Sequence, residues 1–70
     1  MSVFTKVYLH DGMTQYDVKD NIRIYMKNGG TKRGIIETIT YDEVVIVWGI
    51  SNDREAIQIK DIEAIDYIDG

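Results

Sequence analysis

The feature that most constrains the fold is an Asn-Gly-Gly turn signal at residues 28–30, which stands between two runs of apolar residues. Before it, Ile22, Ile24 and Met26 alternate with polar or aromatic side chains, the period of a half-buried strand. Asparagine and glycine tolerate the positive φ angles that a tight hairpin requires. The stretch from residue 22 to Ile39 therefore predicts a β-hairpin.

The second strand of this hairpin is expected from about Thr31 to Thr40, and it contains Gly34. A glycine inside a strand loses packing and backbone entropy unless the strand bends or another backbone approaches closely. Because small barrels contain strongly bent strands, Gly34 favours that architecture.

Three further strands are expected in the second half of the chain. The strand from Glu43 to Gly49 is apolar on both faces, so the core, the N-terminal segment or a partner must cover both sides. A fourth strand contains Ile57 and ends at a break near Lys60-Asp61, and a fifth runs from Ile62 to Ile68. This pattern predicts a mainly β protein, a small five-stranded, strongly bent antiparallel barrel.

The N-terminal part of the chain is harder to interpret. Thr14 and Asp17 have the spacing of a weak capping box, which predicts a short helix near residues 13–20 with Tyr16 on one face. Val3 to Leu9 has the composition of a strand, and its conformation is left open.

The length of 70 residues indicates one domain, residues 1–70, with an N-terminal segment at 1–20 and the barrel at 21–68. A chain of this size buries only about 60% of its unfolded surface. It contains no cysteine and one histidine, so disulfides and thiolate metal sites are excluded and association is the remaining route to extra stability.

The longest apolar run, Val44 to Trp48, is far too short to span a bilayer. Together with the lack of cysteine, this predicts a soluble, cytoplasmic protein with no membrane partner.

The formal net charge of -4 opposes binding to polyanions. The charge is unevenly distributed, however, because residues 1–36 carry +3 and residues 37–70 carry -7. The basic side chains are concentrated in the predicted hairpin, which is the one region suited to phosphate binding.

The hairpin resembles the first motif of the Sm/LSm family, and most closely that of the Hfq branch of bacterial RNA chaperones. The family positions are occupied without a gap by Ile22, Ile24, Met26, Asn28, Gly29, Gly34 and Ile36. Arg23, Tyr25 and the Gly-Ile-Ile-Glu-Thr of residues 34–38 add Hfq-like detail. The resemblance implies an N-terminal helix, a bent barrel, and a homo-oligomeric ring of six or seven subunits in which the fourth strand of one subunit pairs with the fifth of the next.

The resemblance also implies single-stranded RNA as a partner. The matching residues on the Hfq surface for adenine-rich RNA are Tyr25, Gly29, Gly30, Lys32 and Arg33. In addition, Tyr41 is a candidate for stacking a base and Lys60 for a pore-side phosphate contact. The alternatives are that the hairpin residues form an ordinary solvated face and that Tyr41 packs on a neighbour.

Other positions depart from the family pattern. In the loop after its second strand the family carries an Asp and an Asn, and here Thr40 stands near the Asp position and Val44 near the Asn position. Asp61 follows Lys60 where Hfq has a Lys-His pair. A carboxylate repeated around a ring repels phosphate. Two alternatives therefore stay open: a ring-forming structural or protein-interaction module that has lost RNA binding, and an unrelated SH3-like barrel that binds a peptide.

Nothing in the sequence favours catalysis or a cofactor. Neither Ser2 nor Ser51 is next to a histidine in the sequence, and no glycine-rich loop opens a helix for phosphates. His10 has no second histidine or cysteine with which to share a metal, so a surface or turn position is expected for it. We expect a protein that is not an enzyme, with no catalytic residues, no metal and no cofactor.

Overall fold

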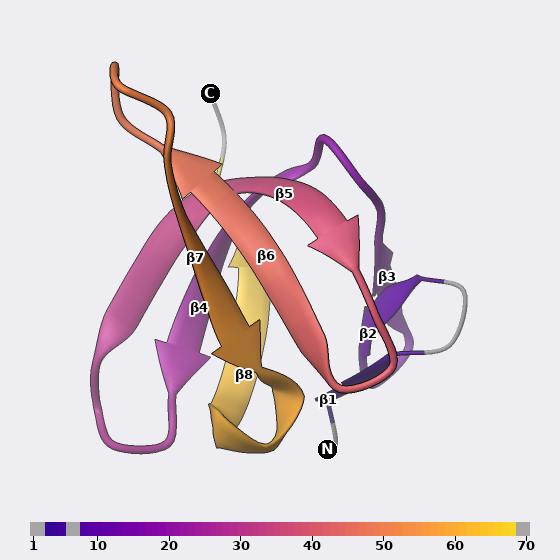
Figure 1. Cartoon of the computed structure of the whole chain (residues 1–70). Coiled ribbons are helices and arrows are strands. Elements are labelled where there is room, and N and C mark those ends of the chain that lie inside the picture. The colour runs from indigo at the N-terminus through magenta and orange to yellow at the C-terminus, as the bar shows by residue number, and fades with distance from the viewer. Residues whose placement is uncertain (1–2, 6–7, 69–70) are drawn as a thin grey trace.

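The computed structural model describes residues 3–5 and 8–68, which form two antiparallel sheets (Figure 1). The smaller sheet contains β1 (Val3–Thr5), β2 (Leu9–Asp11) and β3 (Thr14–Tyr16) in chain order. The larger sheet contains β4 (Asn21–Met26), β5 (Thr31–Ile39), β6 (Glu43–Trp48), β7 (Asp53–Gln58) and β8 (Ile62–Tyr67), in the order β7-β6-β5-β4-β8. A 3-10 helix, η1 (Ile59–Asp61), separates β7 from β8.

The predicted hairpin is confirmed as β4 and β5. Its turn closes through the bond from the Met26 N–H to the Gly30 carbonyl, at 2.8 Å, while Gly29 adopts a φ of 94°. The Asn28 side chain accepts a hydrogen bond from the Gly30 N–H at 2.9 Å. This local bonding is the reason that asparagine and glycine suit the turn.

The predicted close approach at Gly34 is also confirmed. A Cβ atom at this position would lie 2.7 Å from the carbonyl oxygen of Val47 on β6. A register shift between Ile36 and Thr38 bends β5 further, and the strand is visibly curved in Figure 1.

Buried apolar side chains from every strand of the larger sheet meet two from the smaller sheet. They are Leu9, Tyr16, Ile22, Ile24, Ile36, Val44, Ile46, Ile57, Ile62 and Ile65. The inner face of β6 is thus covered by the core as expected, whereas Val45 and Val47 on its outer face are half-buried. The core lies between the two sheets and inside the curl of the larger one.

The predicted helix near residues 13–20 is wrong. Gly12, with a φ of 63°, instead turns the chain into the β2–β3 hairpin, and Tyr16 packs into the core. An isolated helix of this length is marginal in water, so tertiary packing decides the conformation. In the described part of the chain, no helix is long and apolar enough to cross a membrane.

The five bent antiparallel strands are present as expected, but the barrel that they were predicted to form is not closed. Within residues 3–5 and 8–68, β7 and β8 are the two edges of the larger sheet and no strand pairing joins them. The turn of η1 separates the two strands, and the smaller sheet packs against β8 instead. The curled sheet therefore stays open.

Three hydrogen bonds and one contact between aromatic rings attach the smaller sheet to β8. Asp11 accepts a bond from the Ile65 N–H at 2.8 Å, and the Tyr16 hydroxyl donates to the Ile65 carbonyl at 2.9 Å. The Tyr67 hydroxyl donates to the Gln15 carbonyl at 2.8 Å, and the Tyr16 and Tyr67 rings lie 4.6 Å apart. The N-terminal segment thus protects part of a sheet edge.

Candidate nucleic-acid-binding surface

The outer face of the larger sheet, meaning the face directed away from the core, carries Tyr25 on β4. Buried Ile24 separates Arg23 from Tyr25, so alternation along the strand directs both of these side chains outward. The residues opposite Tyr25 on the neighbouring strands are small, Thr31 on β5 and Ala64 on β8. Small neighbours on both sides leave room beside the ring for a stacked base.

Asp66 on β8 holds both Arg23 and Tyr25 in place. Its carboxylate accepts bonds from Arg23 Nε at 3.2 Å and from the Tyr25 hydroxyl at 3.1 Å. The guanidinium carbon of Arg23 lies 5.8 Å from the Tyr25 ring centroid, within cation–π range. The hydrogen bond to Asp66, reinforced by its negative charge, raises the pKa of Arg23, which stays charged.

Arg33 adds a second cation to this face. It lies on β5 directly opposite Arg23, and its side chain is exposed. Among residues 3–5 and 8–68, no carboxylate forms an ion pair with Arg33. A carboxylate therefore pairs with only one of these two guanidinium groups, which gives the strand pair a local excess of positive charge beside Tyr25.

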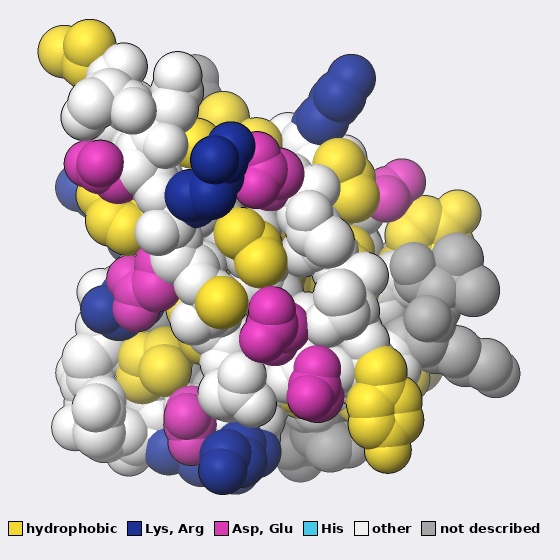
Figure 2. Space-filling view, in the orientation of Figure 1, with side chains coloured by type: hydrophobic (Ala, Val, Ile, Leu, Met, Phe, Trp, Pro, Cys, Tyr) yellow, Lys and Arg dark blue, Asp and Glu magenta, His cyan; other side chains and the backbone are white. Residues whose placement is uncertain are grey.

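The face shown in Figure 2, over β6 and β7, has a different character, because acidic, basic and apolar side chains are interspersed there. Glu37 and Arg54 form a two-point ion pair on the outer side, at 3.0 and 2.8 Å. Positive charge is consequently not accumulated on β6 and β7, and the surface around Tyr25 is the better candidate for an anionic ligand.

Lys32 is not part of the Tyr25 surface. It has the same alternation as Gly34 and Ile36, which face the core, so its side chain lies on the inner side of β5 while Arg33 lies on the outer side. Its Nζ forms an ion pair with Glu55 on β7, at 3.0 Å. The structure thus places Lys32 and Arg33, which the resemblance to the family motif had grouped on one RNA-binding surface, on opposite faces of β5.

The remaining predicted RNA-binding residues lie apart from Tyr25. Gly29 and Gly30 form the β4–β5 turn, and Lys60 belongs to η1. Tyr41 lies in the β5–β6 turn with 90% of its surface exposed, and its backbone carbonyl accepts a bond from Thr5 Oγ1 at 2.6 Å. The ring of Tyr41 is therefore available to solvent and does not pack on a neighbour as the alternative expected.

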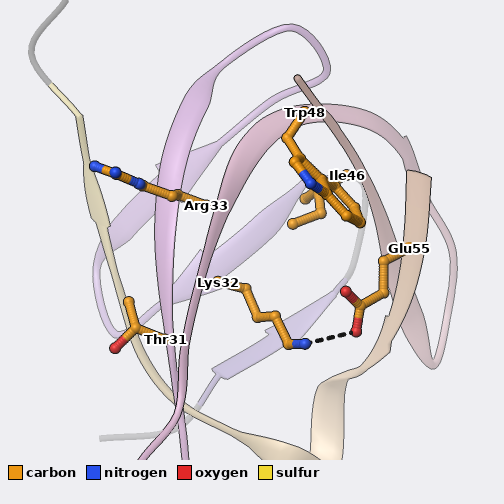
Figure 3. Close-up of a pocket in the computed structure, with 6 residues that line it drawn as sticks. All are labelled: Thr31, Lys32, Arg33, Ile46, Trp48 and Glu55. Carbon is orange, nitrogen blue, oxygen red and sulfur yellow. Dashed lines mark ion pairs between the residues drawn. The ribbon is translucent and has the colours of Figure 1, made fainter. Parts of the chain in front are cut away.

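Sequence reasoning missed a pocket of about 320 Å³ at one end of the inner face (Figure 3). Trp48 and Ile46 of β6 form one wall, and the Lys32–Glu55 ion pair lies across from the indole. The available signal was that Trp48 ends an apolar strand with the alternation of core residues Val44 and Ile46.

The described residues contain no group of three or more histidine, cysteine, aspartate or glutamate side chains arranged to hold a metal ion. His10 lies on β2, in a strand rather than a turn, and its ring stacks on Phe4 with centroids 4.6 Å apart. Its visible role is aromatic packing.

No protein-family model matches the chain, and neither a curated protein nor a solved structure shows significant similarity to it. The class that the fold itself defines is a small, mainly β domain of two antiparallel sheets.

Proposed function

We propose that this chain is a non-enzymatic, Sm-like protein that binds single-stranded RNA on the outer face of β8, β4 and β5. The observation that carries the proposal is Tyr25 between two small neighbours, with Arg23 against its ring and Arg33 close by. An aromatic platform flanked by cations is the usual equipment for binding an unpaired strand. Stacking contributes about 1 to 3 kcal/mol per base, and the guanidinium groups bind phosphates.

Charge limits this binding. The chain has a net charge of -4, and Asp66 offsets one of the two arginines. We expect weak binding that falls steeply with salt, because phosphate contacts release counterions.

The homo-oligomeric ring is part of the same proposal. The sheet order leaves β7 and β8 as edges, and these are the strands that the Sm resemblance pairs between subunits. Ile65 stands opposite Ile24 with both its N–H and its carbonyl directed away from β4, where Asp11 and Tyr16 bind them. Pairing along the whole of β8 therefore requires these two bonds to open.

A second candidate, the ring-forming module without RNA binding, is favoured by one observation. Asp66 already occupies the Arg23 guanidinium and the Tyr25 hydroxyl, as a structural network would. In that case the surface stabilises the sheet and has no ligand.

Fluorescence anisotropy with labelled oligo(A) and oligo(U) at low salt tests RNA binding. Arg33→Glu should weaken binding strongly, whereas Lys19→Glu, the same charge change in an exposed turn, should weaken it much less. Tyr25→Ala should also weaken binding. An absence of saturable binding by the folded wild-type protein, or equal losses in Arg33→Glu and Lys19→Glu, would exclude this surface.

Analytical ultracentrifugation tests the ring. A six- or seven-subunit species is expected at micromolar concentration. A monomer under these conditions would contradict the ring and leave the peptide-binding SH3-like alternative.

A further inference from the structure

The pocket on the inner face is separate from the proposed RNA surface. Figure 3 shows Lys32, Glu55, Ile46 and Trp48 around one hollow, while the Arg33 side chain points away from it. At about 320 Å³ the pocket lies at the small end of the range for ligand sites.

The indole of Trp48 supplies an apolar wall. Its side chain belongs to the inner face, yet the residue retains 39% of its surface exposed, unlike buried Ile46 below it. A large aromatic ring that stays accessible in a hollow is suited to stacking a flat heterocycle.

The polar side of the pocket presents a donor beside two acceptors. Lys32 Nζ and Glu55 Oε2 lie 3.0 Å apart, and both side chains are partly exposed, so each retains hydrogen-bonding capacity toward a ligand. Lysine is only a donor and an ionised carboxylate only an acceptor. The pair thus offers an ammonium donor beside a two-oxygen acceptor, and the indole of Trp48 forms the facing wall of the pocket.

We propose that this pocket binds a guanine base, with the ring stacked on Trp48. The Watson–Crick edge of guanine carries the O6 acceptor next to the N1–H and N2–H donors. Lys32 donates to O6, and the Glu55 carboxylate accepts from N1–H and N2–H. Adenine, cytosine and uracil each lack two adjacent donors on this edge, so none of them can donate to both Glu55 oxygens at once.

The base can belong to a free guanine nucleotide or to a strand of RNA, and both contain the same heterocycle. Titration with guanosine monophosphate tests the first source. Titration with a short oligo(U) containing one internal guanosine, compared with oligo(U) alone, tests the second.

Fluorescence reports the pocket directly, because Trp48 is the only tryptophan of the chain. Saturable quenching by guanosine monophosphate is expected, with adenosine, cytidine and uridine monophosphates binding at least about tenfold more weakly, as a two-point hydrogen-bonded contact discriminates. Equal quenching by all four nucleotides, or no saturation with guanosine monophosphate, would overturn the proposal.

A matched pair of variants separates the pocket from general charge effects. Glu55→Gln replaces one pocket acceptor by a donor and should reduce guanosine monophosphate affinity about tenfold or more. Glu37→Gln makes the same change in the outer-face ion pair with Arg54 and should leave affinity unchanged. Equal losses in both variants contradict the assignment.

A further measurement uses the wild-type protein, so it does not depend on whether a variant folds. On addition of guanosine monophosphate, the backbone amide NMR signals of Trp48, Lys32 and Glu55 and the indole signal of Trp48 should shift. The amide signal of Tyr25 should not shift. Shifts confined to Tyr25 and Arg33 would instead place the nucleotide on the proposed RNA surface.

Arg33→Glu should retain guanosine monophosphate binding even where oligo(A) binding is lost.

Discussion

The carboxylate of Asp11 accepts a hydrogen bond from the backbone N–H of Ile65 at 2.8 Å. Ile65 belongs to an edge strand, and this N–H points away from the sheet. A side chain from the smaller sheet thus takes the place of a neighbouring strand, which is one way in which proteins protect exposed edges.

We predict that Asp11→Ala destabilises the protein by about 1 to 3 kcal/mol, because the Ile65 N–H loses its partner in a partly buried position. The control is Asp42→Ala, which removes an exposed carboxylate whose side-chain contact is a long 3.4 Å bond from Thr40, and should cost less than about 0.5 kcal/mol. Urea denaturation measures both, and hydrogen exchange at Ile65 should accelerate only in Asp11→Ala. Equal losses of stability in the two variants would show that the hydrogen bond from the Ile65 N–H to Asp11 contributes nothing.

Gly34→Ala should also be destabilising, by about 1 to 3 kcal/mol, for a steric reason. The added Cβ would lie 2.7 Å from the Val47 carbonyl oxygen, and a backbone atom cannot move aside cheaply. At Gly29, by contrast, the space is open and only the φ of 94° opposes a side chain. Asparagine tolerates such a φ better than alanine does, so Gly29→Asn should cost less than Gly29→Ala.

Thermal denaturation of these three variants checks the distinction between a close approach and a turn conformation. A Gly34→Ala variant as stable as the wild-type protein would mean that β5 and β6 can separate without loss.

Stability should fall as the pH rises from about 10 to 12. Burial, followed by the nearby Asp11 carboxylate, raises the pKa of Tyr16 from 10.0 to about 12. In this interval the folded state keeps a proton that the unfolded state has lost, so the contribution is complete below the unfolded pKa and disappears as pH passes the folded one. Burial also raises the pKa of Tyr67, which acts in the same direction.

Urea midpoints measured across this alkaline interval provide the test. Tyr16→Phe should make the decline shallower without abolishing it, because Tyr67 still contributes. An unchanged slope in Tyr16→Phe would assign the effect to other groups.

The ion pair between Glu37 and Arg54 should contribute less than about 1 kcal/mol although it has two contacts, because both side chains are substantially exposed. A double-mutant cycle of Glu37→Gln and Arg54→Gln measures the coupling. The coupling should shrink when salt is added. A large coupling that resists salt would contradict this expectation.

Local signals explain which elements could be predicted. The boundaries of β4 and β5 follow from alternation and from the bonding of Asn28 and Gly29, which involve residues close in sequence. The helix near residues 13–20 was mispredicted because Tyr16 finds its partner at Ile65, 49 residues away. Its capping-box pattern was weaker than that tertiary contact.

In the candidate site, too, some residues could be predicted from the sequence and others could not. Tyr25 and Arg33 were found from residue type, but Lys32 was grouped with them although its alternation with Gly34 and Ile36 placed it on the other face. Trp48 was overlooked because an apolar residue at the end of an apolar strand resembles ordinary core. Its pocket forms only when β5, β6 and β7 are adjacent and curled.

The sequence by itself determined the five strands between residues 21 and 67, since strand period and turn chemistry act over a few residues. Only the tertiary structure decided that the sheet stays open, that Asp11 and Tyr16 cover the edge at Ile65, and that Lys32 meets Glu55 beside Trp48. Those contacts join residues far apart along the chain. They depend on strand order and curvature, which no local pattern encodes.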